Sequence, residues 1–259
     1  MKVVILAGGR GTRISEESSL RPKPMVPIGG MPIIWHIMKI YSSYGFNEFI
    51  ICCGYKGEYI KKYFVNYVMK CKSTKFDFTS RNDDFPKITT DSSNENWKIV
   101  LANTGLNTLT AGRIKKIEEY IGDDEEFMLT YGDGVADIDI SKLIKFHRSA
   151  GKILTISTTQ PEGRFGAIKI ENGIVNSFQE KARQDQSYVN IGFMVMNRKI
   201  FEYLGDGLDM LEREPFEKLA SIEQMAAYKH DGFWSPMDNI NDRAYLEKLW
   251  RINAPWKVW

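Results

Sequence analysis

A glycine-rich segment near the start of the chain holds the residue types best suited to bind an anion. Residues 2–13 read KVVILAGGRGTR, so an apolar run breaks into Gly8, Gly9 and Gly11 and then ends in a hydroxyl and a guanidinium. Glycines let a phosphate approach the main-chain N–H groups closely, and Arg13 adds a permanent positive charge. We therefore predict that this loop holds the phosphates of a nucleotide.

Two familiar nucleotide-binding motifs do not match the loop. The dinucleotide fingerprint requires a glycine three residues after Gly11, where Ile14 stands, which disfavours a nicotinamide-dependent oxidoreductase. The P-loop requires Gly-Lys-Ser/Thr, whereas Gly11 is followed by Thr12 and Arg13. The sequence thus predicts a phosphate loop of another kind.

A lysine between two prolines follows in the segment RPKPM. Proline fixes its own φ and restricts the residue before it, so Lys23 is presented from a stiff segment. An ordinary surface loop is the alternative for this segment taken alone.

Two aspartates are candidates for binding a cation. Asp133 stands between glycines in YGDG, directly after the predicted strand 127–131, where a carboxylate can hold a hard cation that bridges phosphates. Asp238, in WSPMDN, would be a second carboxylate for the same cation. A structural turn residue is the alternative at both positions.

Other polar residues follow predicted strands. Thr104 and Gly105 come after the strand 97–102, and Arg113 opens the predicted helix 113–121. Loops of this kind share one edge of a doubly wound sheet, where ligands collect. A cation in the first turn of a helix is unfavourable to the helix dipole, so Arg113 there would suit an anionic ligand that offsets this effect. The alternative is an arginine that faces solvent and binds no ligand.

A further polar set lies in the second half of the chain. Glu180, Lys181 and Asn190 offer an acceptor, a cation and an amide, which together suit a sugar bearing a phosphate. Each of them singly is more commonly a surface residue.

The elements that must position these residues have α/β periodicity. Apolar strands alternate with amphipathic helices through the first half, so we predict a Rossmann-like, doubly wound, mixed and mostly parallel sheet. The stretch 71–96 is predicted to be mostly irregular. An antiparallel hairpin is expected over 166–178 around Asn172-Gly173, and a helical carboxyl-terminal part includes the predicted helices 215–228 and 242–250.

Composition excludes several classes of protein. The chain has 259 residues, 43% of them hydrophobic, and a net charge of +2 with mixed charges, which argues against a nucleic-acid groove or a membrane-binding face. Cys52, Cys53 and Cys71 fit neither a zinc site nor a disulfide framework, so a reducing cytoplasm is expected. The three histidines are expected to be structural, and four of six tryptophans lie after residue 230, which indicates a packed terminus or an oligomer contact.

The ordered motifs LAGGRGTR, RPKPMVPIGG, YGDGVAD, FQEKA and WSPMDN resemble those of the sugar-1-phosphate nucleotidylyltransferases over the whole chain. The segments MPIIWHIMK, IICCGYKG, GRFGAIKI and NAPWKVW are similar to members that use CTP and glucose 1-phosphate. One departure is Ala182, which stands where proline commonly follows the glutamate-lysine pair and leaves that loop less rigid.

The resemblance implies roles for particular residues. Arg13 and Lys23 would be catalytic, Glu180, Lys181 and Asn190 would bind the sugar phosphate, and Asp133 and Asp238 would hold Mg²⁺. The nucleotide would contact Leu6, Ala7, Gly8, Gly9, Gly11, Thr12, Arg13, Lys23, Thr104, Gly105, Arg113 and Gly132.

The resemblance also implies a nucleotide-diphospho-sugar transferase fold. A single nucleotidyltransferase domain would span 1–259, with a nucleotide-binding core at 1–150, a sugar-phosphate-binding part at 151–240 and an aromatic carboxyl-terminal tail at 241–259. A cytoplasmic homo-oligomer is expected, in which subunits share sites through Arg113, with neither nucleic acid nor membrane as partner.

The implied reaction transfers a cytidylyl group from CTP to α-D-glucose 1-phosphate and gives CDP-glucose and pyrophosphate. The product would serve deoxysugar or surface polysaccharide (O-antigen) biosynthesis. The alternatives are the same reaction with UTP, dTTP or another sugar 1-phosphate, and a non-catalytic sensor that binds a nucleotide sugar.

Overall fold

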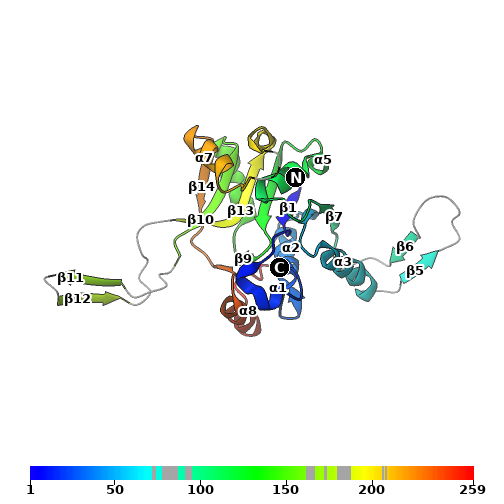
Figure 1. Cartoon of the computed structure of the whole chain (residues 1–259), viewed down its shortest axis with the longest axis horizontal. Coiled ribbons are helices and arrows are strands. Elements are labelled where there is room, and N and C mark those ends of the chain that lie inside the picture. Colours follow the sequence, from blue (N-terminus) through cyan, green and yellow to red (C-terminus); the bar gives the residue numbers. More distant parts are fainter. Residues whose placement is uncertain are drawn as a thin grey trace.

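A computed structural model describes residues 1–71, 74–77, 87–90, 95–161, 167–171, 174–179, 188–205, 207 and 209–259. Its centre is a seven-stranded sheet in which only one strand runs against the others (Figure 1). In spatial order the strands are β14 (Met225–Lys229), β10 (Leu154–Thr159), β13 (Val189–Asn197), β8 (Glu126–Tyr131), β1 (Val3–Leu6), β4 (Glu48–Cys53) and β7 (Lys98–Asn103).

The strand β13 is the exception, because it pairs antiparallel with both β10 and β8. At the centre, β1 pairs in parallel with β4 and β8, with Val3 opposite Phe49 and Met128. The expectation of a mixed, mostly parallel sheet is therefore confirmed.

Both faces of the sheet are covered, which explains the uninterrupted apolar run of β1. Val3 and Ile5 belong to the core on one face, whereas Val4 and Leu6 belong to the core on the other. The first face packs against α2 (Ile33–Ser43), α3 (Gly57–Cys71), α6 (Ile140–Ala150) and α8 (Ile240–Ile252). The second packs against α4 (Thr110–Lys115), α5 (Glu118–Ile121), the 3₁₀ helix Arg198–Tyr203 and α7 (Glu214–Ser221).

Local capping signals fix several helix ends. The Asp139 side chain accepts a hydrogen bond from Lys142 N at the start of α6, and Gly151 ends this helix in the left-handed conformation. At the start of α8, Asn239 and Asp242 form a reciprocal capping box. No helix among the residues with described placement is long and apolar enough to cross a membrane.

The prediction of irregular structure over 71–96 was wrong for two short segments. The strands β5 (Thr74–Asp77) and β6 (Lys87–Thr90) pair antiparallel. Four residues are too few to show a clear period in sequence, so their mutual pairing is what defines them. The strands β11 (Ala167–Glu171) and β12 (Ile174–Gln179) form the predicted hairpin, whose Asn172-Gly173 turn lies outside the described residues. The two hairpins extend from opposite sides of the body (Figure 1).

The predicted helix 215–228 was also wrong in its second half. The helix α7 ends at Ser221, the chain turns at Glu223 with a φ of 56°, and β14 then pairs in parallel with β10. Apolar residues in this segment satisfy a helical period, but the free edge of β10 provides backbone partners that a sequence pattern does not record.

The aromatic residues at the carboxyl end form a packed terminus. Trp256 is fully buried, and its ring lies against Phe233, Trp250 and His36. The indole Nε1 of Trp256 donates to Nδ1 of His36 over 3.4 Å, while Nε2 of His36 donates to the Ile28 carbonyl over 2.9 Å. The carboxyl end is thereby attached to the core helix α2.

Candidate active site

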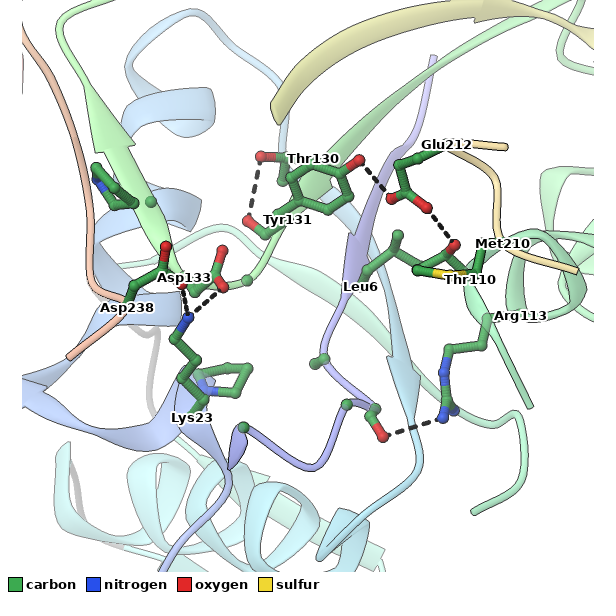
Figure 2. A pocket seen from close by; sticks show the side chains of 18 of the residues that line it. Leu6, Lys23, Thr110, Arg113, Thr130, Tyr131, Asp133, Met210, Glu212 and Asp238 are labelled. Atoms are coloured by element: carbon green, nitrogen blue, oxygen red, sulfur yellow. Dashed lines mark hydrogen bonds and ion pairs between the residues drawn. The ribbon is translucent and has the colours of Figure 1, made fainter. Parts of the chain in front are cut away.

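A cavity of about 710 Å³ opens where β1 and β8 end and β13 begins (Figure 2). Because β13 is antiparallel, its first residues lie at the same sheet edge as the last residues of β1 and β8. The predicted site residues that line the cavity are Leu6, Ala7, Gly8, Gly9, Gly11, Thr12, Lys23, Arg113, Gly132, Asp133, Asn190 and Asp238.

The glycine loop leaves β1 along this cavity. Its backbone is tied to β4 and the following turn, because Ala7 N donates to Cys52 O and Tyr55 N donates to Gly8 O. Gly11 has a φ of 64°, and a Cβ added at Gly9 would meet nothing within 4 Å. The loop then enters a 3₁₀ helix, Thr12–Ile14, which contains Arg13, whose side chain lies outside the described part of the structure.

The structure shows a reason for the glycine at position 8 that the sequence did not indicate. A Cβ at this position would lie 2.2 Å from Nη1 of Arg113, so the missing side chain makes room for the guanidinium. Gly8 therefore accommodates Arg113 as well as lining the cavity, and its contact with a phosphate stays a prediction.

The prediction that Arg113 lies in the first turn of a helix was wrong, and so was the alternative of a solvent-facing side chain. Arg113 lies in the last turn of α4, where a cation is favourable to the helix dipole, and only 4% of its surface is exposed. Its guanidinium donates to Gly8 O (3.0 Å), Thr104 Oγ1 (2.6 Å) and Gly105 O (2.8 Å). Burial lowers the pKa of this guanidinium. The arginine thus joins the glycine loop to the loop after β7.

This arrangement also locates Thr104 and Gly105. Thr104 is 1% exposed and donates to Cys53 O over 2.8 Å. Among the residues whose placement is described, the cavity lining includes Thr108, Leu109 and Thr110 but neither Thr104 nor Gly105. Both residues accept hydrogen bonds from the Arg113 guanidinium and are linked to the cavity lining through it.

Lys23 and two aspartates form the charged centre of the cavity. The ammonium of Lys23 contacts Asp133 Oδ2 at 2.7 Å and Asp238 Oδ1 at 2.8 Å (Figure 2). Lys23 begins a short 3₁₀ helix, Lys23–Met25, with Pro22 as its amino-terminal cap and Pro24 inside it. The two prolines restrict the backbone on either side of the lysine. Its side chain is only 11% exposed.

A small antiparallel ladder brings the two aspartates together. The strand β9 (Gly134–Ala136) pairs with β15 (Trp234–Pro236), and Met237 N donates to Asp133 O over 2.8 Å. Asp133 and Asp238 flank this ladder at the same end. Residues 105 positions apart in sequence therefore share one cation, Lys23 Nζ.

The predicted sugar-phosphate set is only partly described. Asn190 lines the cavity from β13, and its Oδ1 accepts a hydrogen bond from Gly192 N over 2.9 Å. Glu180 and Lys181 lie outside the described residues, as does Ala182.

Among the cavity residues that were not predicted from the sequence, Tyr131, Thr110 and Glu212 are joined by hydrogen bonds. The phenol of Tyr131 donates to Glu212 Oε1 at 2.6 Å, and the hydroxyl of Thr110 donates to Glu212 Oε2 at 2.8 Å (Figure 2). These residues come from β8, α4 and the segment before α7, and Glu212 belongs to no motif. Nothing in the local sequence indicates that they meet.

Comparisons with known proteins agree with this geometry. The family model for nucleotidyl transferases matches residues 2–241. The chain is 48% identical over 260 residues to the glucose-1-phosphate cytidylyltransferase of Salmonella typhi, and 44% identical over 261 residues to a probable glucose-1-phosphate cytidylyltransferase of Bacillus subtilis. Each match covers 100% of both chains.

The fold also has solved counterparts. The crystal structure of HddC from Yersinia pseudotuberculosis matches with a TM-score of 0.65 and 24% identity, covering 96% of this chain and 99% of that one. At this identity the likeness shows the fold alone. The full-length sequence matches carry the assignment: the chain belongs to the nucleotidyl transferase family, and within it to the glucose-1-phosphate cytidylyltransferases.

Proposed function

We propose that the chain transfers a cytidylyl group from CTP to α-D-glucose 1-phosphate, with CDP-glucose and pyrophosphate as products. The observation that carries this proposal is the convergence of Lys23, Asp133 and Asp238 beside the glycine loop in one cavity. Full-length relatives with 44–48% identity are named for the same reaction.

The reaction brings two anions together. A phosphate oxygen of the sugar phosphate attacks the α-phosphorus of CTP in line, and the bond from that phosphorus to the bridging oxygen of pyrophosphate breaks. The protein must therefore align the reactants and offset their negative charge, which requires no nucleophilic side chain.

The residues of the cavity suit these tasks. Backbone N–H groups of the loop with Gly9 and Gly11, together with Arg13, would bind the triphosphate. Lys23 would contact a phosphate at the reacting centre, because its rigid segment brings the ammonium to the cavity. The Arg113 guanidinium donates to four oxygens of the protein, so we assign it the role of holding the loop in shape.

Asp133 and Asp238 fit a divalent cation. Their carboxylates converge on one cationic atom at 2.7 and 2.8 Å, which shows that both reach a single point. Groups of three or more acidic, histidine or cysteine side chains are absent from the described residues, so further ligands would come from water and phosphate oxygens. Bound there, Mg²⁺ would neutralise charge on the phosphates. Lys23 would then be free to turn toward substrate.

The sugar phosphate would be bound from the β13 side of the cavity by Asn190, together with Glu180 and Lys181. We further infer that the protein works as a cytoplasmic homo-oligomer and supplies CDP-glucose for deoxysugar or surface polysaccharide (O-antigen) synthesis. Self-association is testable by light scattering, which would report a single chain mass if this inference is wrong.

The activity is tested by measuring pyrophosphate release from CTP, UTP, dTTP and GTP, each with glucose 1-phosphate and Mg²⁺. We expect the highest kcat/KM with CTP. Faster release with UTP or dTTP would overturn the cytidylyl assignment, and release with none of the triphosphates would indicate a non-catalytic binding protein.

A further inference from the structure

A carboxylate stands in the cavity apart from the Lys23 centre. Glu212 lies just before α7 and lines the cavity together with Tyr131 and Thr110. Figure 2 shows its carboxylate between these two residues, on the far side of the opening from Lys23. The catalytic roles proposed above make no use of this group.

The position of this carboxylate is fixed by donors on both oxygens. Tyr131 donates to Oε1 and Thr110 donates to Oε2, at 2.6 and 2.8 Å. Thr110 Oγ1 itself accepts a hydrogen bond from Leu211 N over 2.8 Å, so its hydroxyl hydrogen is directed to Glu212. A side chain held at two points in this way loses little further entropy when it contacts a ligand.

The ring of Tyr131 is also held in place by its neighbours. A Cβ at Gly192 would lie 2.6 Å from the ring of Tyr131, and Gly192 has a φ of 85°, so only glycine allows β13 to pass the ring at this distance. Burial raises the pKa of the Tyr131 phenol well above its usual range, and the nearby Glu212 charge acts in the same direction. Tyr131 therefore remains a donor to Glu212 at neutral pH.

Glu212 differs electrostatically from the two aspartates. Asp133 and Asp238 share the ammonium of Lys23, whereas the groups that contact Glu212 among the described residues are neutral hydroxyls. A carboxylate has about four acceptor sites, and these contacts use two of them. Because Glu212 lines the cavity, its other acceptor sites are available to hydrogen-bond donors on a ligand. Its negative charge disfavours a phosphate beside it.

We propose that Glu212 is a specificity-determining residue that accepts a hydrogen bond from a sugar hydroxyl of a substrate, with Tyr131 and Thr110 as positioning residues. This inference rests on the proposed function, which places two sugars in the cavity: the ribose of CTP and the glucose of glucose 1-phosphate. Both present hydroxyls to a charged acceptor. The repulsion of phosphate by Glu212 would direct the phosphates toward Lys23 and the glycine loop.

The test compares Glu212→Gln with the unaltered protein on substrates that lack single hydroxyls. The analogues are 2′-deoxy-CTP and 3′-deoxy-CTP, and glucose 1-phosphate deoxygenated at position 2, 3, 4 or 6. With the normal substrates, we expect Glu212→Gln to raise the KM of one of them about 10- to 100-fold, as for a hydrogen bond to a charged group. The kcat should stay within about threefold, because the contact exists before and during the reaction.

The decisive readout is the coupling between the variant and the missing hydroxyl. With the analogue that lacks the partner of Glu212, the protein and the variant should have equal KM values. Equal KM values with a deoxy-CTP would show that the hydroxyl bound by Glu212 belongs to ribose. Equal KM values with a deoxyglucose phosphate would show that it belongs to glucose. The proposal is overturned if the KM penalty is the same with every analogue, or if Glu212→Gln changes no KM.

Two further variants separate this role from a structural one. Glu214→Gln removes an exposed carboxylate two residues away and should leave both KM values unchanged. Tyr131→Phe keeps the Glu212 charge but removes one positioning donor, so a rise of about three- to tenfold in the same KM is expected. If Glu212→Gln has a lowered melting temperature, the KM values with all deoxy analogues are compared between the unaltered protein and Tyr131→Phe instead. This comparison then tests the proposed contact of Glu212.

A wrong assignment of the nucleotide can be distinguished from a wrong role for Glu212. The unaltered protein is assayed first with CTP and the other triphosphates. If another triphosphate proves to be the substrate, the hydroxyl series is made with that nucleotide, and the Glu212 coupling is measured in the same way.

Discussion

Arg113 donates a hydrogen bond from Nη2 to the carbonyl oxygen of Gly8 over 3.0 Å, although 105 residues separate them in the chain. The guanidinium runs so close to the Gly8 Cα that a side chain there would overlap it. A glycine of the phosphate loop and a buried arginine of α4 are therefore matched in shape, and the loop depends on this contact for its position.

The first prediction concerns this fit. Gly8→Ala should lower the free energy of unfolding by about 1–3 kcal/mol, because the added Cβ must displace either Arg113 or the loop. Gly9→Ala is the matched control, since its Cβ would meet nothing within 4 Å and should change stability by less than about 0.5 kcal/mol. Urea unfolding of both variants measures the difference, and equal losses would contradict the packing argument.

Arg113→Lys should impair the site without contact to substrate. A lysine keeps the charge but lacks the planar fork that reaches Gly8 O, Thr104 Oγ1 and Gly105 O together. We expect a loss of stability of about 1–3 kcal/mol and a higher KM for CTP. The KM for CTP and the melting temperature should change together across Arg113→Lys and Gly8→Ala. A raised KM in a variant of unchanged stability would instead favour direct contact with nucleotide.

Asp133→Asn should abolish metal-dependent turnover while the fold persists. The substitution removes one of the two carboxylates that converge on a single point, so kcat/KM should fall at least about 100-fold. The assay is pyrophosphate release over a range of Mg²⁺ concentrations, with circular dichroism to check the fold. Asp231→Asn alters an exposed aspartate and serves as control. Near-normal activity of Asp133→Asn would remove it from the proposed metal site.

Lys23→Met should separate metal binding from catalysis. The ammonium of Lys23 competes with a divalent cation for Asp133 and Asp238, so its removal should tighten Mn²⁺ binding about tenfold or more in the absence of substrate. Electron paramagnetic resonance of free Mn²⁺ measures this directly. Turnover should fall in the same variant, because the phosphate contact is lost. Weaker Mn²⁺ binding than in Lys98→Met, which alters an exposed surface pair, would refute the competition.

Stability should fall at acidic pH in a manner that depends on His36. Burial lowers the pKa of His36 from 6.5 to about 4, so the unfolded chain binds a proton more readily than the folded one. The contribution of neutral His36 is complete above pH 6.5 and is lost as the pH falls from 6.5 toward 4, by up to about 3 kcal/mol. Protonation of Nδ1 would also break the contact from Trp256.

Denaturant unfolding between pH 8 and 4 tests this dependence. His36→Gln should be less stable than the unaltered protein at pH 8, yet its stability should fall less steeply below pH 6.5. Parallel curves for the two proteins would show that other groups cause the acid sensitivity.

The sequence by itself determined the features that depend on a few adjacent residues. Buried strands, the cap at Asp139, the glycine loop and the proline-flanked Lys23 follow from local backbone preferences and short-range spacing. The ordered motifs were sufficient to recognise the family, because each motif is continuous in the chain.

Only the tertiary structure decided which distant groups meet. The burial of Arg113 against Gly8, the β14 strand in place of a helical end, and the contact of Glu212 with Tyr131 and Thr110 all join segments far apart in sequence. A sequence pattern records the preference of each segment, whereas sheet pairing and close packing determine which preference is realised and which side chains share a cavity.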